Sequence, residues 1–125
     1  AYGAVSIALH TEMLIVAKKT GLDPAGILDA LPLLSPGIGS APVALHAQVL
    51  NGHYEADISN KRLQDDIGRV LDAARAAATP AMFLPLFAAA ALSAAHSPHA
   101  TGGGLDVARW MAGNAGVAFG AKPIS

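Results

Sequence analysis

Apolar side chains recur at steps of three and four residues along most of the chain, which is the spacing of one face of an α-helix. Two lysines and then Gly21 follow the first such run, a combination typical of a helix end. We therefore expect a helix over residues 5–19 that buries its apolar set. The members of that set are Val5, Leu9, Met13, Val16 and Ala17.

Proline, glycine and Asn-Gly signals divide the rest of the chain into further helical segments. Asp23-Pro24 is typical of an N-cap followed by proline at the first helical position. No segment alternates as a strand does, and no internal repeat is evident. The sequence therefore predicts an all-α protein of about six helices. The other five are expected over residues 24–31, 42–50, 60–78, 81–96 and 105–111.

The segment 60–78 has the clearest division into an apolar and a charged face. The segment 81–96 is apolar all round, so we expect it to be central. The predicted core consists of the apolar residues that recur on one side of each segment. They are Leu9, Met13, Val16, Ile27, Leu31, Leu45, Leu63, Ile67, Leu71, Phe83, Phe87, Ala91, Leu105 and Met111.

Length and composition indicate one domain with a large apolar surface. The chain has 125 residues, 53% of them apolar and only 14% charged, whereas an ordinary soluble domain is about 25% charged. A charge-poor surface is typical of a domain that packs on partners. The net charge of −1 and the scattered basic residues indicate no nucleic acid partner.

Cysteine content and the length of the apolar runs bear on location. The chain contains no cysteine, which fits a reducing compartment, and we expect a cytoplasmic protein. The longest apolar run, residues 81–95, is interrupted by Pro85 and is shorter than the roughly 20 residues of a bilayer span. We therefore expect no membrane association.

Several residue groups are compatible with chemistry, and each also has a plainer interpretation. Gly102-Gly103-Gly104 before a helix is compatible with phosphate binding, but no strand precedes it, so a flexible linker is favoured. His96 and His99 are separated by a helix-breaking proline, and we expect no metal site. His10, with Glu12 nearby, is expected on a helix surface or at a subunit contact, as are His46 and His53.

Three stretches together resemble the C-terminal domain of the β-hydroxyacid dehydrogenases, the family of 3-hydroxyisobutyrate dehydrogenase and relatives of 6-phosphogluconate dehydrogenase. They are residues 12–24, which contain Lys-Lys-Thr-Gly-Leu-Asp-Pro, residues 52–75 followed by Pro80, and Gly104-Leu-Asp-Val-Ala108. The likeness covers most of residues 5–112. It implies a helical substrate and dimerisation domain over residues 1–112 and a Rossmann domain outside this chain that binds NAD or NADP. The residues themselves indicate a Gly-rich tail over 113–125.

The resemblance also implies which residues would act. The family's catalytic lysine falls before Ala1, so no catalytic residue is named here. The family's Lys-Asp pair, which faces the cofactor, matches Asp65 and Asp66, and Lys61, one turn earlier on the same face, would supply the positive charge lost at Asp65. Lys61, Asp65 and Asp66 are the expected cofactor-binding residues. The family also has a phenylalanine seven residues before the lysine of that pair, and this chain has Ile58 at the matching position.

The resemblance implies hydride transfer between NAD or NADP and a small 3-hydroxy acid, in a homodimer or higher homo-oligomer that is inactive without its Rossmann domain. The alternative is a non-catalytic helical module that binds a partner helix or an apolar ligand. Sequence upstream of Ala1 would distinguish the two. A Gly-x-Gly-x-x-Gly motif after a strand there would favour the enzyme.

Overall fold

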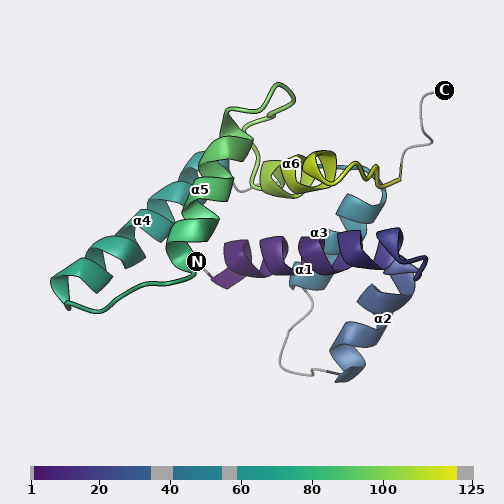
Figure 1. Cartoon of the computed structure of the whole chain (residues 1–125), viewed down its shortest axis with the longest axis horizontal. Helices are drawn as coiled ribbons and strands as arrows, with labels where there is room; N and C mark the ends of the chain where they lie inside the picture. Colours follow the sequence, from purple (N-terminus) through teal and green to yellow (C-terminus); the bar gives the residue numbers. More distant parts are fainter. Residues whose placement is uncertain (1, 35–40, 55–58, 121–125) are drawn as a thin grey trace.

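The structure, a computed structural model, describes residues 2–34, 41–54 and 59–120 (Figure 1). Within these ranges the chain forms six α-helices and no β-strand, which confirms the all-α prediction. The helices are α1 (Tyr2–Lys19), α2 (Pro24–Leu34), α3 (Ala41–Leu50), α4 (Asn60–Ala76), α5 (Leu84–Ala95) and α6 (Asp106–Asn114). The helix α2 runs past its expected end at residue 31, and α5 begins three residues later than expected.

The longest helix, α1, lies between two groups of helices (Figure 1). On one side it packs against α2 and α3, which also pack against each other. On the other side it packs against α6, and α6 packs on α5. The helix α4 packs mainly on α5, so this pair forms an arm at the edge of the molecule.

The turns between helices form where the sequence predicts them. The helix α1 ends in a turn at Gly21, whose φ of +83° suits glycine. The side chain of Asp23 accepts a hydrogen bond from the Ala25 amide at 3.1 Å and so caps α2. At the start of α4, the Ser59 hydroxyl accepts from the Arg62 amide at 3.1 Å.

Much of the predicted core is confirmed. Leu63, Ile67, Phe87, Ala91 and Leu105 are buried in one hydrophobic cluster. Leu31, Leu71 and Met111 are partly buried and pack against that cluster, and Ile27 is half-buried. Leu45 lies outside the residues whose side chains the structure describes.

The predicted core face of α1 is confirmed at Ala17, which is buried, and at Val5, which packs against the core, but it is wrong at its other three positions. Leu9 and Val16 are each 56% exposed and Met13 is 40% exposed, whereas the buried apolar residues of α1 include Ile7, Leu14 and Ile15. Apolar residues occupy both sides of this helix, so their spacing alone fits either face. The choice was decided by neighbours far along the chain, because α3 and α6 cover the other side.

Phe83 was also assigned wrongly to the core, since its side chain is 76% exposed. Its backbone is helical and its carbonyl oxygen accepts from the Phe87 amide at 3.2 Å, so it lies one turn before Phe87. Its side chain is uncovered because it lies at the very start of α5, beyond the buried part of that helix. The helix α5 is not buried all round either, because Leu86 is 70% and Leu92 50% exposed. One side of α5 therefore faces outward.

The chain after α6 packs back on the molecule. Phe119 is buried in the core. Gly120 has a φ of +69° and lies so close to α3 that an added Cβ would be 2.6 Å from the Asn51 carbonyl oxygen. In the described part of the chain, none of the helices combines the length and apolar character needed to cross a bilayer.

Candidate functional site

The three expected cofactor-binding residues lie together on the first turns of α4. The Lys61 ammonium lies 3.0 Å from a carboxylate oxygen of Asp65, and both side chains are largely exposed. The Asp66 carboxylate lies 3.3 Å from the Arg69 guanidinium. The extra positive charge that we expected from Lys61 is therefore opposed by Asp65, so the pair presents little net charge.

The amino end of α4 is anchored to two other segments. The backbone amide of Asn60 donates to the Gly102 carbonyl oxygen at 2.8 Å, and Ser59 and Gly103 form an isolated antiparallel bridge. The buried Asn60 side chain donates to the Ala91 carbonyl oxygen of α5 at 3.2 Å. These contacts fix Lys61 and Asp65 relative to α5 and to the loop before α6.

The loop before α6 is organised by one buried carboxylate, Asp106. Its two oxygens accept from the Thr101 amide at 3.1 and 3.0 Å, from the Thr101 hydroxyl at 2.8 Å and from the Gly102 amide at 2.9 Å. Charge-assisted bonds of this kind are stronger than neutral ones. Asp106 thus holds the segment that in turn holds α4.

This arrangement argues against both interpretations of the triple glycine. The amide of Gly102 already binds Asp106, and the amide of Gly103 donates to the Thr101 hydroxyl at 3.2 Å. An arriving phosphate would meet a fixed carboxylate rather than free amides. The loop is therefore a structural connection, and it is not the flexible linker that we expected.

An aromatic and a cationic side chain meet beside this loop. The Arg109 guanidinium lies 5.6 Å from the centre of the Tyr54 ring and donates to the His99 carbonyl oxygen at 3.2 Å. Burial raises the pKa of the Tyr54 hydroxyl, and the neighbouring Arg109 charge acts in the opposite direction. Tyr54 is thus held neutral over a wide pH range.

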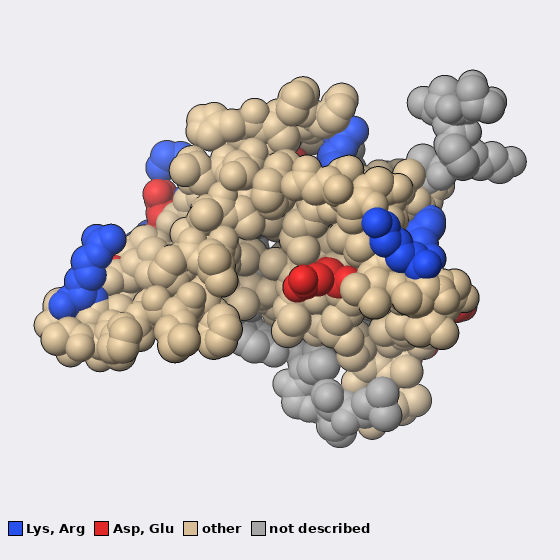
Figure 2. All heavy atoms as spheres, in the orientation of Figure 1, with Lys and Arg blue, Asp and Glu red and all other residues tan. Residues whose placement is uncertain are grey.

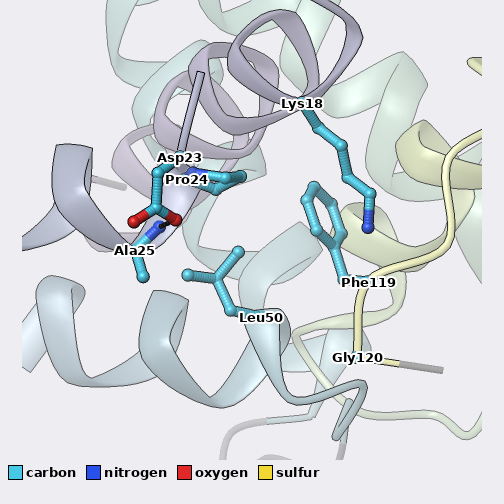
Figure 3. Close-up of a pocket in the computed structure, with 7 residues that line it drawn as sticks. All are labelled: Lys18, Asp23, Pro24, Ala25, Leu50, Phe119 and Gly120. Atoms are coloured by element: carbon cyan, nitrogen blue, oxygen red, sulfur yellow. Dashed lines mark hydrogen bonds between the residues drawn. The ribbon is translucent and has the colours of Figure 1, made fainter. Parts of the chain in front are cut away.

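A small pocket of about 220 Å³ lies where α1, α2, α3 and the C-terminal segment meet (Figure 3). Lys18 extends beside the Phe119 ring, 5.6 Å from its centre, and donates to the Ala118 carbonyl oxygen at 2.7 Å. The Asp23 carboxylate on the opposite wall caps α2. Both charged groups already hold structural elements in place, so we assign the pocket to the packing of these elements and not to a ligand.

His10 and His46 form a buried pair between α1 and α3, so the expectation that they lie on the surface is wrong. Their rings are 4.9 Å apart and edge-to-face. The His46 Nε2 lies 2.9 Å from the Ile7 carbonyl oxygen and therefore carries a proton that it donates. Burial, and secondly the His46 charge, lower the pKa of His10. Glu12, in contrast, is exposed.

The remaining candidates are not brought together. The helix α5 ends at Ala95, so His96 and His99 do not share a helix face. Over residues 2–34, 41–54 and 59–120, no group of three histidine or acidic side chains has the geometry to hold a metal ion. Ile58 lies outside the described residues. The sequence reasoning missed Asn60 and Thr101, for which no local pattern gives a signal.

Comparisons of the chain with protein-family models, with curated proteins and with solved structures find no match.

Proposed function

We propose that the chain is the helical substrate and dimerisation domain of an NAD- or NADP-dependent 3-hydroxyacid dehydrogenase. The cofactor would bind a Rossmann domain outside these residues, and α4 would face it through Lys61, Asp65 and Asp66. One observation carries the proposal. Two segments that resemble the family separately, the start of α4 and Gly104-Leu-Asp-Val-Ala108, belong to one hydrogen-bonded unit through Gly102, Gly103 and Asp106.

In this proposal, Lys61 binds an anionic group of the cofactor or substrate. Its ion pair with Asp65 is exposed, and such pairs contribute only about 0–1 kcal/mol. The ammonium can therefore leave Asp65 for a phosphate or carboxylate at little cost. Asp65 then lowers the affinity for that anion, because it competes for Lys61 and repels negative charge.

The experiment measures the affinity of the protein carrying this domain for NADH and NADPH by fluorescence. Lys61→Ala is expected to weaken binding about tenfold and Asp65→Asn to strengthen it severalfold, in line with charge-assisted contacts. Arg62→Ala removes a neighbouring exposed cation and serves as the control. An affinity unchanged by Lys61→Ala would remove Lys61 from the site.

Activity tests the proposal as a whole. Reduction of NAD⁺ or NADP⁺ by a panel of small 3-hydroxy acids is expected from the protein that joins this domain to a Rossmann domain. The alternative is a non-catalytic helical module that binds a partner helix or an apolar ligand. Absence of turnover with every acid in the panel would favour the module.

A further inference from the structure

The outward face of α1 carries an ordered stripe of exposed residues. They are Leu9, Glu12, Met13, Val16 and Lys19, and they recur at three- and four-residue steps on one side of the helix. The middle of this α1 stripe is apolar, with a carboxylate toward the amino end and an ammonium toward the carboxyl end. Figure 2 shows the same order, with acidic atoms over the middle of α1 and basic atoms over its carboxyl end.

The α1 stripe, apart from Lys19, lines a shallow groove of about 400 Å³, together with Ala17 and with Leu22 beyond the end of the helix. Leu22 is 60% exposed. Glu12 and Lys19 make no ion pair or hydrogen bond within the described ranges of the chain. Exposed apolar side chains gathered in this way mark an interface, and the two uncommitted charges limit what can cover it.

We propose that the α1 stripe is the surface on which two copies of the chain associate, with their α1 helices antiparallel about a two-fold axis beside Val16. In such a pair, positions equally far from the axis on opposite sides meet. Glu12 then meets Lys19 of the partner subunit, and Lys19 meets the partner's Glu12. Both charged contacts share this midpoint, so they agree on one register, and the exposed side chains of Met13 and Val16 lie between the two helices.

Charge complementarity favours a second copy of this chain in this orientation. A parallel pair would place Glu12 against the partner's Glu12, and like charges in contact oppose association. In the antiparallel pair both charges of each copy are matched, with no other partner required. The charged contacts set the register, and the apolar contacts between them supply the attraction.

The available area indicates a weak dimer. The exposed parts of the apolar side chains in the groove offer on the order of 400 Å² per copy, about half of what each partner gives to a standard interface. Association in the micromolar range is therefore expected for α1 alone. The inference rests on the dimerisation part of the proposed function and not on its cofactor chemistry, so its failure would leave the activity test undecided.

The test is sedimentation velocity of the chain over a concentration series from about 5 to 500 µM. The unaltered chain is expected to pass from monomer to dimer. Glu12→Lys and Lys19→Glu each place like charges at both contacts, and each is expected to weaken association at least about tenfold. Arg62→Glu makes the same charge change as Lys19→Glu, but on α4, and is expected to leave association unchanged.

Mixing the two single variants gives the decisive result. In a mixed pair, Lys introduced at position 12 meets Glu introduced at position 19, and the native Lys19 and Glu12 meet at the other contact. The mixture and the double variant are therefore both expected to regain the dimer. Circular dichroism checks the fold, and Val16→Asp, at the axis, is a second disruptive variant at an exposed position. A chain monomeric at every concentration, a dimer insensitive to all three substitutions, or a mixture that stays monomeric would overturn the proposal.

Discussion

Buried polar side chains link segments that are distant along the chain. The His46 Nε2 donates to the Ile7 carbonyl oxygen at 2.9 Å, and the Asn60 side chain donates to the Ala91 carbonyl oxygen at 3.2 Å. Across the described residues, no buried side-chain nitrogen or oxygen lacks a hydrogen-bond partner. Unpaired polar groups would each cost about 1–3 kcal/mol. The burial of His10 was unpredictable from composition because it depends on the packing of α1 against the distant His46.

His10 makes the stability of the fold depend on pH. Its pKa in the folded chain is lowered by burial and by His46, so the unfolded chain binds the proton more readily. The contribution of His10 is full above its unfolded pKa of about 6.5 and is lost as the pH falls toward its lower folded pKa. His10→Gln is therefore expected to reduce the loss of melting temperature between about pH 7.5 and pH 5.

The control for this prediction is His53→Gln, which alters an exposed histidine. This variant is expected to keep the pH dependence of the unaltered chain. The measurement is thermal unfolding followed by circular dichroism across the pH series. If His10→Gln keeps the same pH dependence as well, His10 is not the group that titrates.

At the scale of elements, helices were predictable and their orientation was predictable only in part. Gly21 and Asp23-Pro24 act on the local backbone, so they located the end of α1 and the start of α2 well. The buried face of α4 was also predictable, because its charges occupy one side alone. The buried face of α1 was not, because both of its sides are apolar.

The candidate site, too, was predictable from local sequence only in part. The placement of Lys61, Asp65 and Asp66 on adjacent turns follows from the helical repeat, and the structure brings them together on α4. Their connection through Gly102 to Asp106 spans about forty residues of sequence. Helical periodicity holds no information about such a contact, since it is set by how α4, α5 and α6 pack.

The contact of the C-terminal segment with α3 gives a prediction at the scale of elements. Gly120→Ala would force a Cβ against the Asn51 backbone at a position with positive φ. A loss of about 3 kcal/mol in the free energy of unfolding is expected from strain and overlap together. Gly116→Ala has a similar φ of +70° but open space, so about 1 kcal/mol is expected from strain alone.

Urea unfolding followed by the fluorescence of Trp110, the single tryptophan of the chain, measures both losses. Equal losses in the two variants would show that the backbone conformation matters and the close approach to Asn51 does not. A larger loss in Gly120→Ala would show that the C-terminal segment is part of the core, through Phe119.

At the scale of the whole molecule, the buried residues are unevenly distributed among the helices. The helix α1 has buried residues from Ser6 to Ala17 and neighbours on several sides. In α4 the buried residues are Asn60, Leu63 and Ile67, all in its first half. Its second half extends along the outer edge of the arm (Figure 1). The anchored half of α4 is the half that carries the candidate site.

This asymmetry predicts that α4 opens from its carboxyl end. Few apolar contacts and exposed backbone hydrogen bonds lower the free energy of local opening. Amides of residues 70–76 are therefore expected to exchange with solvent deuterium at least about tenfold faster than those of residues 64–67, measured by hydrogen-exchange NMR. The middle of α1 is the internal control and should exchange most slowly. Uniform protection along α4 would mean that its outer half is covered in solution, and an association surface on the arm would then have to be sought alongside the α1 stripe.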